Sequence, residues 1–284
     1  MYKSFLALIQ CPNCKSEQLT TSVSEQTAEQ IIKGNIHCEE CKTNYPVVDG
    51  IPLMVDEEKQ KEVLENWNVS SGYEDYTLKP TKQVKKMVQQ HSKGTKLALD
   101  SGCGSGAYTS LFASDEIVCV DLVPFFLKKL RTEYRGNSKL HVTVADIRKL
   151  PLKQKTADIV FCSQVLEHLK KDEFNAVIKN YTEISKQTVL VDVPNESGII
   201  VQLFRNLFGA FGFYHKNTAS DDNLHHHCQF GVNDFKKMDF KVHGCIGWVS
   251  ASFINLGPVW QLYDKIVWSH PSLGGTIIGV RGIR

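Results

Sequence analysis

The sequence contains no long apolar run. No stretch approaches the ~18 uninterrupted apolar residues that a membrane-spanning helix needs. The N-terminal stretch MYKSFLALIQCP also lacks the apolar core and small-residue cleavage site of a secretory signal. The nine cysteines are an odd number, which argues against a disulfide framework. We therefore expect a cytoplasmic protein without a membrane-spanning segment.

The chain also has little net charge. Its 33 Lys and Arg residues nearly balance 31 Asp and Glu residues, which gives a formal charge of +2 and a pI near 8.0. The first 60 residues are acidic, with five lysines against nine acidic side chains. A protein that binds nucleic acid through phosphate contacts usually shows a strong basic patch. The composition makes a nucleic-acid partner possible but does not favour it.

Four of the cysteines form two C-x-x-C pairs near the N-terminus. They are Cys11, Cys14, Cys38 and Cys41. Two such pairs place four thiolates around one tetrahedral zinc ion. A module of this size cannot bury enough core to fold without the metal. We predict a structural zinc here, and the alternatives are a zinc-free remnant or redox chemistry.

A glycine-rich loop follows a short apolar strand at 96–99. Its glycines, Gly102, Gly104 and Gly106, have the spacing G-x-G-x-G, whereas dinucleotide-binding folds carry G-x-G-x-x-G. Asp100 lies two residues before the first glycine. A carboxylate there would repel a pyrophosphate, but it suits S-adenosylmethionine (SAM), whose ammonium and sulfonium are cationic. We expect a helix after the loop.

Acidic residues also mark the ends of the next two predicted strands. Asp121 ends the strand at 117–120, and Asp146 follows the strand at 140–145. An acid about 20 residues after the glycine loop accepts hydrogen bonds from both ribose hydroxyls. For any one of these acids, a helix cap or a turn is the simpler interpretation. The three acids together favour a SAM site.

Two parts of the chain resemble known families. Residues 5–56, and most specifically Tyr45-Pro46 to Asp49-Gly50-Ile51-Pro52, resemble the zinc-ribbon family that activates tRNA and rRNA methyltransferases as a separate subunit. Residues 92–195, with their glycine loop, three acids and the segment SQVLEH, resemble class I SAM-dependent methyltransferases of the type 11 group.

The resemblances imply an architecture. The fold class is α/β, with a doubly wound, seven-stranded, mostly parallel sheet that ends in an antiparallel hairpin, preceded by a small zinc ribbon. The expected parts are a zinc ribbon at 1–56, a linker and entry or lid helix at 57–92, and a methyltransferase domain at 93–284 with an insertion at 196–228. In such a sheet, the three acids and Ser163 lie at the carboxyl ends of strands, where ligands bind.

The methyltransferase resemblance also assigns roles to further residues. It implies that Asp146 caps the adenine amino group and that Ile147 packs on the adenine ring. The segment from Ser163 to His168 lines the cofactor and opens toward the substrate. Leu122, beside Asp121, joins the cofactor-binding set. Tyr73 belongs to an aromatic segment that covers the donor in relatives, and packing within the linker is the alternative.

The acceptor is less well defined than the donor site. The sequence carries no N-P-P-Y type motif, no Pro-Cys nucleophile after the fourth strand, and no C-x-x-x-C-x-x-C radical cluster. Apolar residues recur at helical spacing through 199–213, which indicates an amphipathic helix that packs over the site, contacts a greasy substrate, or touches a membrane surface. We expect a small, fairly apolar or lipid-linked acceptor, with RNA, protein or a non-catalytic partner role as alternatives.

A run of three histidines and a cysteine, NLHHHCQFG, occupies 223–231. Adjacent side chains diverge, so the three imidazoles cannot all reach one metal ion. The run resembles a join in related methyltransferases where one histidine faces the acceptor. We therefore take His227, together with His168, as candidate catalytic residues, and structural capping is the alternative.

Overall fold

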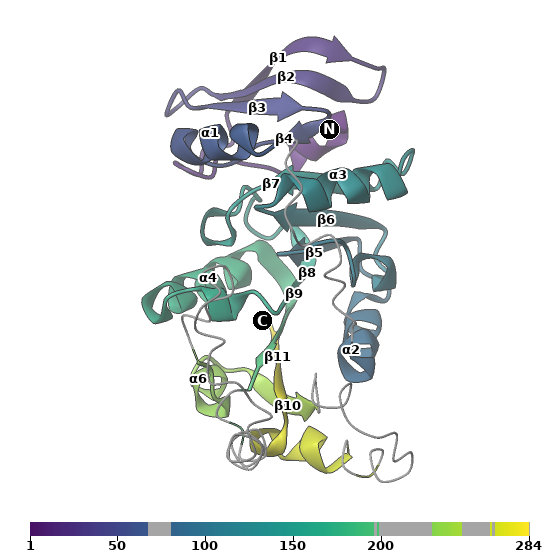
Figure 1. Ribbon diagram of the computed structural model, residues 1–284, viewed down its shortest axis with the longest axis vertical. Coiled ribbons are helices and arrows are strands. Elements are labelled where there is room, and N and C mark those ends of the chain that lie inside the picture. The colour runs from purple at the N-terminus through teal and green to yellow at the C-terminus, as the bar shows by residue number, and fades with distance from the viewer. Residues whose placement is uncertain (68–80, 196–197, 199–228, 246–261, 263–264, 284) are drawn as a thin grey trace, which may run out of the picture.

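The structure is a computed structural model that describes residues 1–67, 81–195, 198, 229–245, 262 and 265–283. Figure 1 shows a small sheet at the N-terminal end, stacked against one edge of a larger sheet that runs through the rest of the molecule. The two termini lie far apart, with the N-terminus in the small sheet.

The N-terminal part is a four-stranded antiparallel sheet in the order β1-β2-β3-β4. Its elements are the 3₁₀ helix η1 (Lys3–Ala7) and strands β1 (Leu19–Gln26), β2 (Ile31–Cys38), β3 (Asn44–Val48) and β4 (Ile51–Pro52). Strand β2 buries Ile31, Ile36 and Cys38. Strand β1 is the outer edge and is exposed along nearly its whole length, so the core of this sheet faces η1 and the larger sheet.

The larger sheet has seven strands in the order β10-β11-β9-β8-β5-β6-β7. They are β5 (Leu97–Ser101), β6 (Glu116–Asp121), β7 (Leu140–Val144), β8 (Ala157–Ser163), β9 (Ser185–Pro194), β10 (Lys241–Cys245) and β11 (Thr276–Gly282). Strands β5 to β9 pair in parallel, and β11 runs antiparallel to both β9 and β10. The predicted mostly parallel sheet with a terminal hairpin is confirmed.

Helices cover both faces of this sheet (Figure 1). They are α2 (Lys82–Ser92), α3 (Pro124–Glu133), α4 (Lys171–Ile184) and the short α6 (Val232–Lys236), whereas α1 (Glu57–Glu65) lies beside the small sheet. Four 3₁₀ turns join them to the strands: η2 (Thr109–Leu111), η3 (Ile147–Lys149), η4 (Leu166–His168) and η6 (Pro271–Leu273). Helix α4 packs with Leu99 and Val118, whereas α2 packs with the alternate residue Ala98, on the other face. The sheet is therefore doubly wound, as predicted.

The prediction of a helix directly after the glycine loop is wrong in one respect. The segment 107–114 forms only the single 3₁₀ turn η2. Two features limit it: few residues separate Gly106 from the start of β6 at Glu116, and Tyr108, Thr109 and Ser110 are weak helix formers. Tyr108 is buried against Phe161 instead, with ring centroids 4.9 Å apart.

Main-chain hydrogen bonds join the small sheet to the edge of the large one. Leu53 pairs with Val144 of β7 in parallel register, and Met54 N donates to Val144 O at 2.8 Å. On the other side, Gln10 N donates to Pro151 O at 2.7 Å. An exposed edge strand would offer unpaired backbone groups to other chains. The N-terminal part thus supplies a hydrogen-bond partner to the Val144 carbonyl, at the end of this edge strand.

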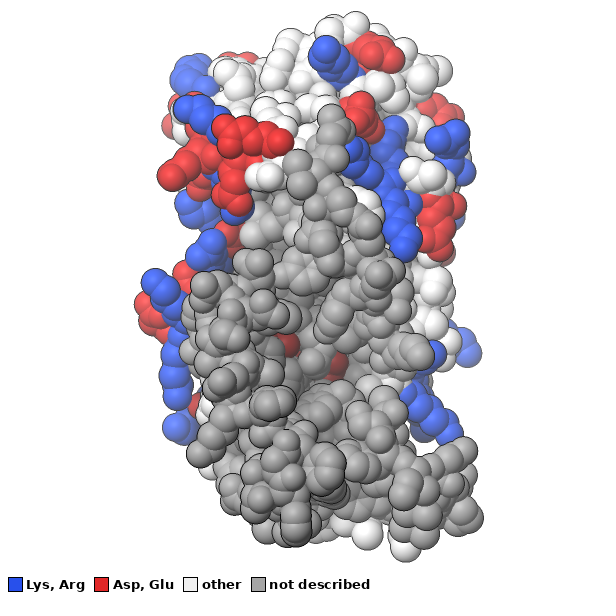
Figure 2. Space-filling model, viewed as in Figure 1, with Lys and Arg blue, Asp and Glu red and all other residues white. Residues whose placement is uncertain are grey.

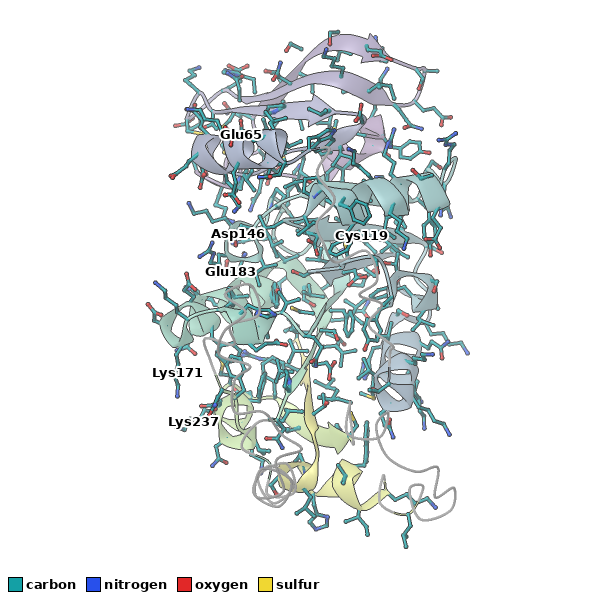
Figure 3. The ribbon with its side chains drawn as sticks, in the orientation of Figure 1. Glu65, Cys119, Asp146, Lys171, Glu183 and Lys237 are labelled. Carbon is teal, nitrogen blue, oxygen red and sulfur yellow. The ribbon has the colours of Figure 1, made fainter. Side chains whose placement is uncertain are left out.

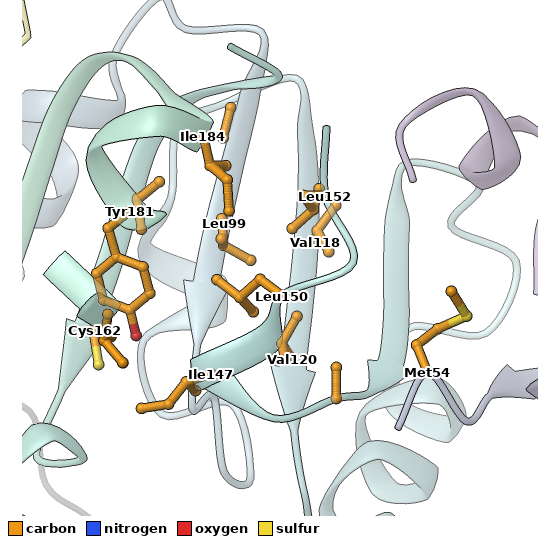
Figure 4. Close-up of a cluster of buried hydrophobic side chains, with 14 of the residues drawn as sticks. Met54, Leu99, Val118, Val120, Ile147, Leu150, Leu152, Cys162, Tyr181 and Ile184 are labelled. Carbon is orange, nitrogen blue, oxygen red and sulfur yellow. The ribbon is translucent and has the colours of Figure 1, made fainter. Parts of the chain in front are cut away.

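The hydrophobic core continues across this seam. Phe5 and Ile9 of the N-terminal part are fully buried and share one cluster with Leu150 and Leu152, which follow η3. Figure 4 shows Leu150 and Leu152 beside the sheet, with Met54 of the N-terminal part at the same cluster's edge. Burying a large apolar side chain contributes about 1.5–3 kcal/mol. The two parts therefore stabilise one another.

Trp67 fixes the chain where it leaves α1. Its indole Nε1 donates to Asp49 Oδ2 at 3.0 Å. The Lys128 ammonium of α3 lies 4.8 Å from the ring centroid and donates to the Trp67 carbonyl at 2.7 Å. These contacts tie the small sheet, α1 and α3 together.

Several predictions from the sequence lie outside the described residues. They concern Tyr73, His227, the amphipathic stretch 199–213 and nearly all of the insertion 196–228. Within the described part of the chain, no helix is both long enough and apolar enough to span a membrane.

Candidate functional site

The four cysteines of the N-terminal part converge on one point. Their sulfur atoms all lie within 4.8 Å of one another, and two of the pairs, Cys11 with Cys41 and Cys14 with Cys38, are 3.5 Å apart. Thiolates at ~2.3 Å around a tetrahedral zinc would be separated by roughly 3.8 Å. The cluster therefore has the ligand set and spacing of a four-cysteine zinc site, in which no coordination position is left for a substrate.

The two C-x-x-C pairs form matching turns. Lys15 N donates to Cys11 O and Lys42 N donates to Cys38 O, each at 2.9 Å. Both lysines have a positive φ, 65° and 60°, because the chain must reverse sharply after each pair. The Tyr45 hydroxyl lies 3.0 Å from the Cys11 sulfur and supports the buried side of the cluster. Such contacts orient metal ligands from outside the coordination shell.

The glycine loop runs from the end of β5 across the end of β6. Gly102 N and Cys103 N both donate to Val120 O, at 2.8 and 3.0 Å. Gly102 has a φ of +75°, and a Cβ on it would lie 2.4 Å from a methyl group of Val165. A larger residue would therefore force the loop away from the segment after β8.

Asp100 and Asp121 support this loop from two neighbouring strands. Asp100 is buried in β5 and accepts a hydrogen bond from the Thr109 hydroxyl at 3.0 Å. Burial, together with the charge of Asp121, raises the pKa of the Asp100 carboxyl to about 7. Asp121 is partly exposed, and its two oxygens accept hydrogen bonds from Gly104 N at 2.8 Å and Val123 N at 2.9 Å. A cation beside the loop would meet both carboxyl groups.

Asp146 lies just after the carboxyl end of β7, the strand next to β6. It is on the side of α4 (Figure 3). It caps η3 by accepting from Arg148 N at 2.8 Å, and the Arg148 guanidinium Nε lies 2.9 Å from both of its oxygens. Arg148 also bridges to Glu173 of α4 at 2.8 Å. Burial raises the pKa of Asp146, but the hydrogen bonds from Arg148 outweigh it and hold the pKa below its usual range. Asp146 is therefore ionised at neutral pH.

The other predicted site residues occupy distinct environments. Ile147 is buried in the cluster that contains Leu150. Leu122 is half-buried and packs against the apolar cluster that contains Leu127 and Leu130 of α3. Ser163 is buried at the end of β8, and its hydroxyl faces β9. His168 ends η4 with an exposed side chain.

Asp192 is a site residue that sequence analysis missed. It is buried near the end of β9, and its Oδ2 accepts hydrogen bonds from the Ser163 hydroxyl at 2.8 Å and the Gln164 amide at 3.2 Å. Its Oδ1 is buried and has no hydrogen-bond partner among the residues that the structure describes. Burial raises the pKa of Asp192 from its ordinary 3.8 to about 6. The feature of the sequence that could have indicated Asp192 is a single acidic residue inside an apolar strand, in the stretch VLVDVP.

Comparison with known proteins finds a family match in each part of the chain. Residues 3–50 match the family described as Trm112p-like protein, and residues 99–188 match the family described as methyltransferase domain. We call the parts of the chain that contain these two matches the Trm112p-like segment and the methyltransferase domain. An uncharacterized protein of Methanocaldococcus jannaschii is 30% identical over 144 residues, which are 49% of this chain and 55% of that relative. The chain thus spans about half the length of the curated relative it matches.

Solved structures similar to the chain include methyltransferases. The magnesium protoporphyrin IX methyltransferase of Synechocystis matches with a TM-score of 0.48 at 14% identity, over 79% of this chain and all of that chain. A complex of the Haloferax volcanii Trm112 methyltransferase activator with a putative methyltransferase also scores 0.48 at 14% identity, over 78% of this chain and 96% of that chain.

The buried Asp192 gives the methyltransferase domain a pH-dependent stability. Its folded-state pKa of about 6 exceeds the ordinary 3.8, so this group favours the folded state below pH 4, and the contribution is lost as the pH rises through 6. We expect Asp192→Asn to be more stable than the parent by about 3 kcal/mol at pH 8 and by only about 1 kcal/mol at pH 4.5. Urea unfolding at both pH values measures this difference. The exposed Asp115→Asn is the control, and an Asp192→Asn variant that is less stable at pH 8 would contradict the assignment.

Proposed function

We propose that the chain is a SAM-dependent methyltransferase in which the Trm112p-like segment binds a structural zinc and supports the catalytic domain. The observation that carries this proposal is the set of residues at the carboxyl ends of β5, β6 and β7. There, a glycine loop and three acids, Asp100, Asp121 and Asp146, lie at the carboxyl ends of successive strands. That edge is where ligands bind in doubly wound sheets.

The residues at this edge fit the parts of SAM. Asp121 would accept the ribose hydroxyls, Asp146 would accept the adenine amino group, and Ile147 would pack on the adenine ring. The buried Asp100 and the backbone of Gly102 to Gly106 would face the cationic methionine end. SAM supplies a methyl group on a sulfonium, and transfer is a displacement that depends on alignment and on exclusion of water. The protein's own contribution is therefore chiefly to position the donor.

The β8–β9 side of the same edge would receive the acceptor. Ser163 and Asp192 form a buried polar pair there, 2.8 Å apart, and His168 lies on the segment that follows. A base is needed only when the acceptor must lose a proton. We propose a small, fairly apolar metabolite or lipid-linked molecule as acceptor, methylated on O, N or C. His168 and His227 stay candidates for the proton-handling role, and Tyr73 for the donor cover.

The zinc site supports a structural role for residues 1–56, which we propose as one domain, followed by the linker at 57–92 and the catalytic domain at 93–284. All four cysteines would bind the metal, which leaves no open position for catalysis. The Trm112p-like segment buries Phe5 and Ile9 in the core of the catalytic part. Zinc binding would therefore stabilise both domains. A cytoplasmic location remains a prediction.

A methyl-transfer screen tests the acceptor class. The purified chain and radiolabelled SAM are incubated with cell lysate that has been treated with RNase, with protease or by organic extraction. We expect the labelled product to resist RNase and protease and to partition into the organic phase. Loss of label after RNase or protease would instead identify RNA or protein as acceptor. An absence of transfer to every fraction, with SAM bound, would favour the non-catalytic partner role.

A further inference from the structure

A cavity lies at the seam between the Trm112p-like segment and the methyltransferase domain. Its volume is about 450 Å³. We call it the seam cavity, and its polar wall is formed by Tyr2, Gln30, Asp49, Arg131, Arg135 and Asn137. Small-molecule sites typically measure ~300–1,000 Å³. The seam cavity is thus large enough for a ligand of its own.

The seam cavity is separate from the proposed SAM site. Its wall includes Leu140 to Val142, the first residues of β7, and the turn after α3. The acids of the SAM site lie at the other end of these strands, where Asp121 ends β6 and Asp146 follows β7. Because the strands are parallel, the seam cavity lies at their amino ends and the proposed SAM site lies at their carboxyl ends.

The wall of the seam cavity carries an excess of positive charge. Lys128, Arg131 and Arg135 line it, and Asp49 is its single carboxylate, so the net charge of these side chains is +2. Figure 2 shows Lys and Arg side chains gathered over the region of α3. His141 also lines the cavity, but burial lowers its pKa to about 4. At neutral pH, His141 is therefore uncharged. Burial also lowers the pKa of the Met1 amino group to about 4, so the two arginines, the lysine and Asp49 set the potential.

Neither arginine forms a salt bridge with a carboxylate of the described residues, although the nearby charge of Asp49 partly offsets the effect of burial on the pKa of Arg131. Within the described part of the chain, no Asp or Glu oxygen lies within 4.0 Å of the guanidinium of Arg131 or Arg135. Arg131 is half-buried, and burial lowers its pKa. Buried charges in proteins are normally paired. An anion in the cavity would give the two arginines a partner at salt-bridge distance, which Asp49 does not provide.

The guanidinium of Arg131 is held in place before any ligand arrives. Its Nη2 donates to the Gln30 amide oxygen at 2.8 Å. The group crosses directly over Gly50, where an added Cβ would lie 2.3 Å from Nη2. Two contacts from the Trm112p-like segment thus orient a side chain of α3. A preorganised guanidinium loses less entropy on binding an oxyanion.

We propose that the seam cavity binds a small molecule that carries a phosphate monoester. Such a group has a charge of about −1.5 to −2 at pH 7, close to the opposite of the wall's net charge. Arginine is also the side chain best shaped for bidentate contact with phosphate. Tyr2, Phe5 and Tyr134 line the remainder and would receive an apolar or aromatic body. This second site goes beyond the proposed methyl transfer and does not depend on it.

Calorimetry with inorganic phosphate and phenyl phosphate tests the proposal on the full chain at low ionic strength. Neither probe resembles SAM. We expect saturable binding of both, tighter for phenyl phosphate, and weaker binding of the monoanion benzoate. Arg131→Gln should reduce the affinity for phenyl phosphate at least about 10-fold, because it removes a charge-assisted contact. Lys129→Gln, exposed on the same helix and outside the cavity, is the matched control and should bind as the parent does.

Two further variants make every outcome decisive. Arg135 is exposed, so Arg135→Gln should keep the fold and still weaken phenyl phosphate binding, even if Arg131→Gln fails to fold. Asp121→Ala should bind phenyl phosphate as the parent does, which separates this site from the proposed SAM site. The proposal is overturned if neither probe binds saturably, or if the folded arginine variants bind as tightly as the parent. Binding of an RNA oligonucleotide without binding of phenyl phosphate would replace it with a nucleic-acid surface.

Discussion

Replacing Cys38 by serine should empty the zinc site and unfold the Trm112p-like segment. Cys38 is a fully buried member of the four-cysteine cluster, and a structural zinc of this type contributes an apparent ~10–16 kcal/mol to folding at neutral pH. A three-cysteine site with a buried serine cannot recover that energy. We expect the zinc content, measured by atomic emission, to fall from about one ion per chain to near zero.

The same variant should destabilise the methyltransferase domain. Phe5 and Ile9 pack in the shared core, and Met54 binds the edge strand β7 through its main chain. Their loss removes several contributions of about 1.5–3 kcal/mol each. At roughly 2–4 °C per kcal/mol for a domain of this size, the Tm of the catalytic part should fall by more than about 10 °C. Differential scanning calorimetry, with hydrogen exchange to locate the unfolded segment, measures both effects.

Two controls separate metal loss from general damage. Cys162 is also fully buried, but it lies in β8 outside the cluster, so Cys162→Ser should keep its zinc even if its stability falls. Alanine at His225, His226 and His227 should likewise leave the zinc content unchanged, because the four cysteines complete the site. A Cys38→Ser protein with full zinc and an unchanged Tm would rule out the assignment of the metal to this cluster.

The strands were predictable because each one is marked by a pattern of neighbouring residues in the sequence. Central parallel strands are buried on both faces and therefore appear as short continuous apolar runs, such as Ile159 to Cys162 in β8. The carboxyl-edge acids followed from the same pattern, since each one ends such a run. The four-cysteine cluster was also predictable, because two C-x-x-C pairs leave few other arrangements.

Contacts between distant segments were not predictable from local patterns. The pairing of Leu53 with Val144 joins residues far apart in the chain, and nothing in either stretch specifies the other. Asp192 was overlooked because a single acid in VLVDVP leaves the strand pattern intact, and its burial depends on Ser163 of the neighbouring strand. The seam cavity has the same origin, because Gly50 and Arg131 meet only after the two parts have docked.

Replacing Asp121 by alanine should abolish SAM binding. The carboxylate would accept both ribose hydroxyls, and hydrogen bonds to a charged group are worth about 1.5–3 kcal/mol each. The same side chain holds the glycine loop through Gly104 N, so its removal also releases the loop that would contact the methionine end. We expect the affinity for SAM, measured by isothermal calorimetry, to fall at least about 100-fold.

Asp115 provides the matched control for this experiment. It precedes the opposite end of β6, is exposed, and lies away from the glycine loop, so Asp115→Ala should bind SAM as the parent does. Asp121→Asn should fall between, because its amide oxygen can still accept one hydrogen bond while the charge is lost. Far-UV circular dichroism and urea unfolding check that each variant is folded. SAM binding by Asp121→Ala as tight as in the parent, or no binding by the parent itself, would refute the placement of the donor at this edge of the sheet.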